Sequence, residues 1–317
     1  RSDEEKKSIH WGQRKLLLSE IEFFTMYWDP IALPNPLCVY AGAGPGTHIP
    51  ILSMLFPSFT FHLYDPRNFN IKPTDRIKIF QEYFTDEIAN NYSGRSDVFF
   101  ISDIRTANYG EIEDEKYTKY GINKATASKN IIDKIYKEAQ IINEDQIWGD
   151  MNMQQNWVLI MNPEHALLKF RLPYALDGKD RIVRYLKGVV YWQVWPPQSS
   201  TETRLKPVRS SEGFYEVENW SILEYEQWCF YHNVIERENI SYLNPFTNSL
   251  DPIDYPELLN DYDSTAEAYI LKLYYENFVP DSTDIYADVI NLSRYITDYI
   301  THSMISKNTC HLCAHLH

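Results

Sequence analysis

Charged residues stand where apolar strand patterns end or are interrupted, and their types could support acid–base chemistry on a ligand. The apolar run 99–102 ends at Asp103 and Arg105. Open α/β sheets bind ligands at their carboxyl edge, so this pair predicts a site there. Lys169 interrupts the apolar pattern of residues 165–173. Burial disfavours an ammonium group and lowers its pKa, so Lys169 could act as a base. The alternative is an edge-strand lysine that reaches solvent.

A glycine cluster follows the first strand pattern. Residues 37–40 run directly into Gly42, Gly44 and Gly46. Glycines permit a sharp turn, bring the backbone close to a ligand and aim the next helix at it. The dinucleotide-binding fingerprint needs a glycine where this chain has Thr47, and the spacing is closer to an S-adenosylmethionine loop. The alternative is a turn that binds no ligand.

Two carboxylates end or follow other strand patterns. Asp65 ends the second one, nineteen residues after Gly46. A carboxylate at this point can accept hydrogen bonds from a ribose, which supports a nucleoside ligand without identifying it. Glu202 lies in a polar turn after the aromatic strand pattern 189–195. Taken alone, Glu202 is an ordinary surface glutamate.

Alternating helix and strand patterns predict a doubly wound, mostly parallel sheet in a Rossmann-like α/β fold. We expect helices at 11–27, 49–56, 124–142, 266–278 and 285–300, and strands at 37–40, 59–64, 77–80, 97–102 and 157–161.

The same patterns predict one domain over residues 11–300, between a flexible segment at 1–10 and a tail at 301–317. Residues 106–150 are polar and are expected to form an inserted crossover, and residues 244–300 a helical C-terminal region. Cys310 and Cys313 in the tail resemble part of a zinc-ligand cluster, but a second spaced pair is missing, so we assign no metal site.

Composition limits the partners and the compartment. The 317 residues carry 30 Lys and Arg against 44 Asp and Glu, a formal net charge of −14. A uniformly basic nucleic-acid binder is therefore excluded, and an RNA site must be a local basic patch. Residues 165–209 carry nine basic and three acidic side chains. Four cysteines and the absence of a long apolar run favour a cytoplasmic protein without a membrane partner.

Several separated motifs together resemble one family. They are Trp11–Leu18, Val39–His48, Ile101–Arg105, Asn162–Pro163 with Lys169, and Thr201–Arg204. Their order is similar to that of the poxvirus-type cap-specific mRNA (nucleoside-2′-O-)-methyltransferases, which also serve as the small subunit of the viral poly(A) polymerase. The resemblance covers about residues 11–300, and it implies a methyltransferase fold with S-adenosylmethionine as cofactor and a location in host cytoplasm or in a virion of a large DNA virus.

The resemblance also implies roles for individual residues. The catalytic tetrad falls on Lys15, Asp103, Lys169 and Glu202, with Lys169 as the general base and Lys15 as a like charge that lowers its pKa. The cofactor-binding positions are Gln13, Tyr40, Gly42, Gly44, Gly46, His48, Asp65, Arg67, Asp103 and Arg105. The capped guanine is expected at Tyr174, Asp177 and Glu226, and this chemistry requires no metal.

Two functions follow from the resemblance. The first is methyl transfer to the ribose 2′-oxygen of the first transcribed nucleotide of capped mRNA. The alternative is an RNA-binding processivity subunit with weak or no methyltransferase activity, whose partner is a poly(A) polymerase catalytic subunit. The four tetrad positions are all present, which favours the enzyme.

Overall fold

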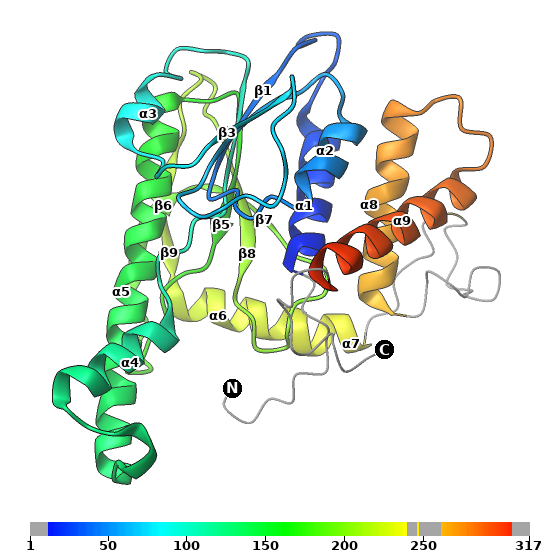
Figure 1. Cartoon of the computed structure of the whole chain (residues 1–317). Coiled ribbons are helices and arrows are strands. Elements are labelled where there is room, and N and C mark those ends of the chain that lie inside the picture. Colours follow the sequence, from blue (N-terminus) through cyan, green and yellow to red (C-terminus); the bar gives the residue numbers. More distant parts are fainter. Residues whose placement is uncertain (1–11, 240–245, 247–260, 306–317) are drawn as a thin grey trace.

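The computed structural model describes residues 12–239, 246 and 261–305. At its centre lies a seven-stranded sheet with the order β3–β2–β1–β4–β5–β8–β7 (Figure 1). The pairs from β3 to β5 are parallel, and β8 and β7 are antiparallel additions. The strands of this sheet are β1 (Leu37–Ala41), β2 (Thr60–Tyr64), β3 (Ile77–Phe80), β4 (Val98–Ser102), β5 (His165–Phe170), β7 (Gly188–Tyr191) and β8 (Thr203–Pro207). The expected mostly parallel α/β sheet is confirmed.

Helices cover both faces of this sheet. In β1, Cys38 and Tyr40 pack into the core on one face, and Val39 and Ala41 pack into the core on the other. The first face is covered by α1 (Gly12–Tyr27), α2 (Ile49–Leu55), α8 (Tyr262–Phe278) and α9 (Ile285–Ile305). The second is covered by α3 (Asp86–Asn90), α5 (Lys129–Met161) and the ribbon of β6 (Ile182–Leu186) and β9 (Val217–Ser221). Burial on both faces explains why the parallel strands are continuously apolar in sequence.

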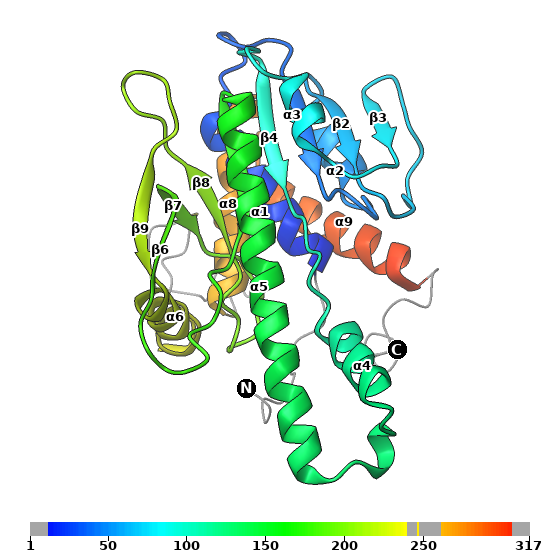
Figure 2. The ribbon, with the colours of Figure 1, turned by 90° about the vertical axis from the view of Figure 1, so that its left-hand side faces the viewer.

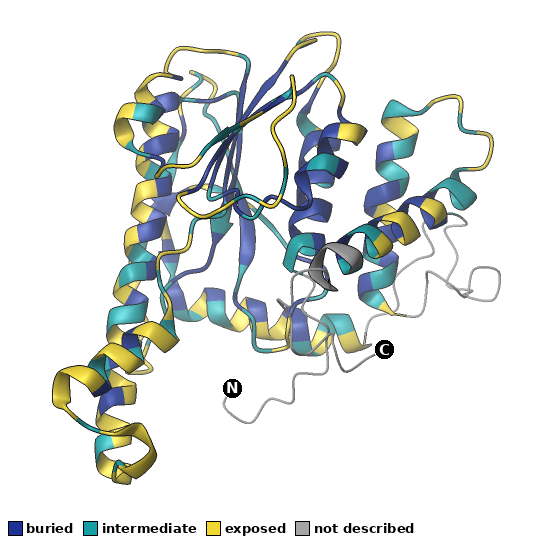
Figure 3. Cartoon of the chain, viewed as in Figure 1, coloured by how far each residue is buried: buried dark blue, intermediate teal, exposed yellow. Residues whose placement is uncertain are grey.

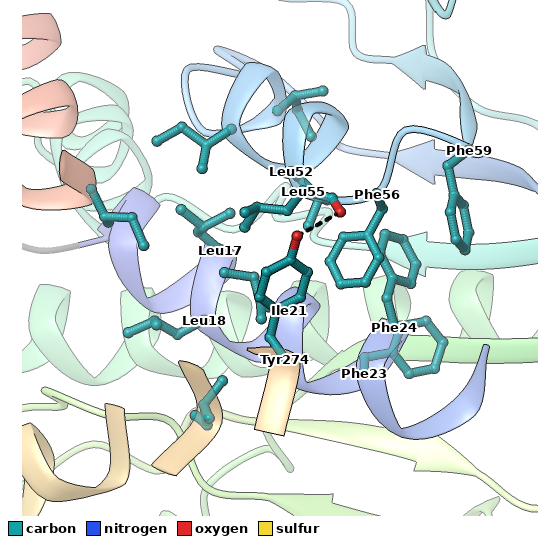
Figure 4. Close-up of a cluster of buried hydrophobic side chains, with 14 of the residues drawn as sticks. Leu17, Leu18, Ile21, Phe23, Phe24, Leu52, Leu55, Phe56, Phe59 and Tyr274 are labelled. Atoms are coloured by element: carbon teal, nitrogen blue, oxygen red, sulfur yellow. Dashed lines mark hydrogen bonds between the residues drawn. The ribbon is translucent and has the colours of Figure 1, made fainter. Parts of the chain in front are cut away.

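Aromatic side chains fill the core between α1, α2 and α8 (Figure 4). Phe24 stacks on Phe59 with ring centroids 4.3 Å apart, and Phe56 meets Tyr274 edge to face. The Tyr274 hydroxyl donates a hydrogen bond to the Leu55 carbonyl at 3.0 Å. In Figure 3, the buried residues of these helices lie mainly on the sides that face the rest of the protein. This packing fixes α1 beside the strands whose ends form the candidate site.

The prediction of a strand at residues 157–161 is wrong. These residues form the last turns of α5, and Trp157, Val158 and Met161 are buried at helical spacing against the sheet. Asn162, with φ 45° and ψ 53°, ends the helix in the left-handed conformation. The strand at this place in the sheet is β5, which begins three residues later.

The inserted crossover at 106–150 is a helical hairpin whose second helix continues to Met161. It contains α4 (Tyr109–Tyr120), η1 (Lys124–Thr126) and the N-terminal part of α5. Figure 2 shows the β4 arrow pointing toward α4, so the hairpin projects beyond the carboxyl edge of the sheet. The short elements α6 (Ile222–Tyr231), η2 (His232–Glu236) and α7 (Arg237–Asn239) follow β9.

The expected boundaries at the C-terminus need one correction. The α9 helix runs through Ile305, so the first residues assigned to the tail are helical. The expected segment at 1–10, most of 244–260 and the cysteines Cys310 and Cys313 lie outside the described residues. No helix in the described part of the chain is both long and apolar enough to cross a membrane.

Candidate active site at the carboxyl edge of the sheet

The strand order reverses between β1 and β4, and the chain leaves both strands at this point. Open α/β sheets bind ligands in the crevice beyond such a reversal. The two exits are tightly joined, because the Asp103 amide donates to the Ala41 carbonyl at 2.9 Å. Gly42 has φ +77°, and a Cβ there would lie 2.7 Å from the Ile104 nitrogen. Only glycine therefore allows the turn after β1 to approach Asp103 this closely.

Three residues predicted as catalytic meet at this edge. Asp103 follows β4, Lys169 lies near the end of β5, and Glu202 directly precedes β8. The Lys169 Nζ lies 3.0 Å from the Asp103 Oδ1 and 3.6 Å from the Glu202 Oε2. These side chains are 14%, 17% and 28% exposed, so the cluster is shielded but open to a ligand. Lys169 is thus not the solvent-reaching edge lysine of the alternative interpretation.

Arg204 is a buried member of this cluster that the sequence did not identify as a site residue. Its side chain is 3% exposed, and its Nη1 lies 2.7 Å from the Asp103 Oδ1. Its Nη2 lies 3.9 Å from the Glu202 Oε1. Arg204 stands directly opposite Lys169 in the β5–β8 pairing, so the Asp103 carboxylate bridges two cations that would otherwise repel each other. The i, i+2 spacing from Glu202 was the available signal, since alternate strand residues share a face.

The charges of the cluster shift the acidity of its members. Burial alone would raise the pKa of Asp103, but Arg204 and Lys169 more than offset this and hold that pKa well below its usual range. The pKa of Glu202 is lowered in the same way by Lys169, Arg204 and Arg105, against the effect of burial. Both acids are therefore ionised acceptors at neutral pH.

Lys15 on α1 belongs to the same electrostatic neighbourhood. Burial lowers the pKa of Lys15, and the positive charges of Arg204 and Lys169 lower it further, while Glu202 and Asp103 act against this. Lys15 therefore lies within electrostatic range of the cluster. All four predicted tetrad positions are close enough to interact.

The glycine turn is tied to Asp65 at the end of β2. The Asp65 Oδ2 accepts a hydrogen bond from the Gly44 amide at 3.0 Å, and both carboxylate oxygens accept hydrogen bonds from Arg67. Asp65 is 2% exposed, whereas the Arg67 side chain is 68% exposed. The turn, an acid and an exposed guanidinium thus lie together beside the strand-order reversal. Arg105 completes the edge by pairing with Glu202 at 2.8 Å.

Other predicted cofactor residues form a buried network with α1. The Tyr40 hydroxyl donates to the Glu20 Oε1 at 2.7 Å, and the His48 Nε2 lies 3.0 Å from the Glu20 Oε2. The Gln13 Oε1 accepts from Thr47 and lies 2.8 Å from the His48 Nδ1. Tyr40 and His48 are 0% and 1% exposed, so in this structure they hold the glycine turn against α1. Their assignment to the cofactor remains a prediction.

Two of the predicted cap residues line one pocket of about 770 Å³ between α5 and the chain after β5. Tyr174 and Asp177 lie on its wall with Trp148 of α5. The Arg171 guanidinium lies 3.9 Å from the centre of the Tyr174 ring and pairs with Glu144. Glu226 lies on α6 in a neighbouring hollow, and its carboxylate accepts from the Ala175 amide at 3.1 Å. Trp148 and Arg171 were not predicted from the sequence as residues of a cap-binding site.

The basic segment 165–209 is less basic in the folded protein than its composition suggests. Six of its nine Lys and Arg side chains make ion pairs with acids, and most of these acids lie outside the segment. The six are Lys169, Arg171, Arg181, Lys187, Arg204 and Arg209. Much of the excess of +6 counted along the sequence is therefore offset by nearby acids, and the basic channel stays a prediction.

Residues 1–140 match the model of the family described as Poly A polymerase regulatory subunit. This is the family that the sequence motifs resemble, and the match covers 140 of the 317 residues. The matched residues include Lys15, the glycine turn and Asp103, whereas Lys169 and Glu202 lie beyond them.

Proposed function

We propose, from this family match and from the charged cluster, that the chain transfers a methyl group from S-adenosylmethionine to a ribose 2′-hydroxyl at the capped end of mRNA. The observation that carries the proposal is the Lys169 amine, 3.0 Å from Asp103 and 3.6 Å from Glu202 at the point of strand-order reversal. A ribose hydroxyl is a weak nucleophile, so it needs a positioned group to take up its proton. Lys169 is proposed to be that group.

The other charged residues orient the reacting groups. The ionised Asp103 holds both Lys169 and Arg204, which fixes the amine along one direction. Glu202 can accept a hydrogen bond from the ribose at its Oε1, because Lys169 and Arg105 contact the Oε2 and the Arg204 Nη2 lies 3.9 Å from the Oε1. Holding the ribose hydroxyl in line with the methyl donor would account for a large part of the rate enhancement of this transfer.

The residues at the glycine turn fit the proposed cofactor. S-adenosylmethionine supplies a methyl group on a sulfonium, which is a good leaving group. Asp65, with Gly44 and Arg67 bonded to it, offers a buried carboxylate at the end of β2, where a ribose diol can bind. Gly42 keeps the turn close to Asp103, so a nucleoside bound at Asp65 would extend toward Lys169.

The pocket beside Tyr174 suits the methylated guanine of a cap. A positively charged purine is attracted to aromatic faces, and acids can bind its protonated edge. Tyr174 and Trp148 supply aromatic surface on the walls of this pocket, and Asp145 and Asp177 supply carboxylates. The Thr201 hydroxyl donates to the Tyr174 hydroxyl at 3.1 Å, which links this pocket to the segment that carries Glu202.

Methyl transfer from labelled cofactor to a short RNA tests the proposal. We expect labelling of RNA with a methylated cap and little labelling of uncapped RNA. Lys169→Ala should lower the rate about 100-fold or more, the range for loss of a general base. Lys78→Ala, at an exposed position on β3, is the matched control and should retain activity. Undiminished activity of Lys169→Ala would contradict the base assignment.

The second candidate function is that of an RNA-binding subunit of a poly(A) polymerase. The family match favours a polymerase subunit more directly than methyl transfer, because the family is described as Poly A polymerase regulatory subunit. A regulatory subunit of this kind works with a catalytic polymerase subunit. We expect the chain to lengthen the tails that the catalytic subunit adds to an RNA primer, as measured on a sizing gel. Unchanged tail lengths in the presence of excess chain would contradict this function.

A further inference from the structure

A second pocket, of about 270 Å³, lies between the edge strand β7 and the helices α1 and α8. Its walls include Val189 and Val190 of β7, Ile270 of α8, Glu22 of α1 and His232 of η2. It is smaller than the 300–1,000 Å³ range typical of small-molecule sites. Its size therefore suits a single long side chain.

Glu22 is an acid without a partner in this pocket. Among the described residues it has neither a hydrogen bond nor an ion pair, and burial raises its pKa to about 7. Acids that are partly buried without a partner are unusual, because desolvation destabilises the charged form. A cation bound beside Glu22 would remove this penalty.

His232 presents an unused hydrogen-bond acceptor in the same pocket. Its ring is 2% exposed and stacks on Trp192 at 4.3 Å. The Nδ1 lies 2.7 Å from the Glu236 Oε2, while the Nε2 is buried and has no partner. Burial lowers the pKa of His232, so the ring is neutral with its proton on Nδ1, and the Nε2 is a free acceptor. The pocket thus offers two acceptors and requires a ligand rich in donors.

The β7 strand beside this pocket has an unpaired edge. It is the last strand of the sheet, next to β8 alone. The Lys187 carbonyl accepts from the Val208 amide at 3.0 Å, and bonding alternates along an antiparallel pair. Val189 and Tyr191 therefore bond to β8, and the amide and carbonyl groups of Gly188 and Val190 face outward. Within the part of the chain that the structure describes, these outward groups have no partner.

We propose that the β7 edge binds an extended segment of the polymerase catalytic subunit, which inserts a lysine or arginine side chain into the pocket between Glu22 and His232. Strand addition satisfies the outward groups of Gly188 and Val190. The aliphatic stem of the inserted side chain packs on Val189, Val190 and Ile270, and its charged end donates to Glu22 and His232. The two acceptors, Glu22 and His232, and the backbone edge of β7 match a protein segment with a cationic side chain better than RNA phosphate, which carries no donor.

This inference rests on the polymerase-binding function and is independent of methyl transfer. The test is titration calorimetry of the purified catalytic subunit with the full chain and its variants. Glu22→Gln keeps the shape of the pocket and removes its charge, and we expect it to weaken binding about tenfold or more. Val190→Pro removes an amide that faces outward and makes no hydrogen bond to β8. We expect this variant to weaken binding as well. Glu115→Gln, at an exposed position on α4, is the control and should bind like the parent chain.

The possible results distinguish failure of this docking site from failure of the polymerase-binding function. Parent affinity in both Glu22→Gln and Val190→Pro, with thermal melting midpoints equal to that of the parent, overturns the docking site and leaves polymerase binding intact. A parent chain that does not bind the catalytic subunit overturns both. Self-association of the parent that Glu22→Gln abolishes, measured by sedimentation, would assign the edge to a second copy and also contradict the proposal.

Discussion

Arg204 shows how much of the site depends on a residue that touches no proposed reacting atom. Its guanidinium is almost fully buried, shares the Asp103 Oδ1 with Lys169 and lies 3.9 Å from the Glu202 Oε1. The Gln193 amide oxygen, turned toward it, accepts from its Nε at 2.9 Å. Without that charge, Asp103 would lose its 2.7 Å ion pair at a shielded position, where the lost solvation of a carboxylate is offset only by its ion pairs and hydrogen bonds.

Replacement of Arg204 should therefore destabilise the fold strongly. We expect Arg204→Met to lower the free energy of unfolding by about 3–5 kcal/mol, since removing one partner leaves buried acids uncompensated. The control is Arg95→Met, because the Arg95–Asp97 pair lies on the surface and contributes less than about 1 kcal/mol. Urea denaturation measures both. If both variants lost the same free energy of unfolding, burial of the Arg204 cluster would make no difference to its contribution to stability.

At the scale of elements, the turn between β1 and α2 decides where Asp103 lies. Gly42 and Gly121 both have positive φ, at +77° and +63°, and alanine in this conformation costs about 1–2 kcal/mol at either position. They differ in surroundings, since a Cβ at Gly42 meets the Ile104 backbone, whereas nothing lies within 4 Å at Gly121.

We expect Gly42→Ala to lose more stability than Gly121→Ala, by about 1–3 kcal/mol, because the added methyl group overpacks the backbone. It should also abolish methyl transfer, since the clash displaces the segment that carries Asp103. Thermal melting and the labelled-methyl assay measure the two effects. An active Gly42→Ala variant with the stability of Gly121→Ala would refute the close approach.

The parallel half of the sheet was predictable from sequence, and the reasons are local. Residues 37–40 and 98–101 are apolar or aromatic at every position, as is typical of strands buried on both faces. The prediction for the end of α5 was wrong because Trp157–Met161 is also a short apolar run. Such a run is typical of a buried helix as well as of a buried strand. The polar residues before it, Gln154 to Asn156, belong to the same helix.

The site was predictable in its residue types and only partly in its contacts. Asp103 and Lys169 follow from strand ends and strand interruptions, which sequence shows directly. Arg204 was missed because a buried ion pair joins residues about 100 positions apart, and no local pattern shows such a partner. Tyr40 and His48 were assigned by resemblance, whereas their bonds to Glu20 depend on how α1 packs against the sheet.

At the scale of the whole molecule, two regions with different chemistry are built on one sheet. The carboxyl edge gathers Lys169 and its acids beside the glycine turn. The helical hairpin of α4 and α5 projects beyond the same edge (Figure 2). The outer strand β7 offers an unpaired edge and a pocket with an acid. One chain could in this way hold an RNA end at one place and a protein partner at another.

Because ion pairs offset most charges of the basic segment, the RNA of the proposed reaction would be bound mainly through its cap and its first nucleotides. The central claim is that the ribose hydroxyl of the first nucleotide accepts the methyl group. The most direct measurement compares label transfer to two capped RNAs, one with a ribose and one with a 2′-deoxyribose at that nucleotide. We expect one methyl group per ribose RNA and none on the deoxy RNA, whereas equal labelling of both would rule out the ribose 2′-hydroxyl as the methyl acceptor.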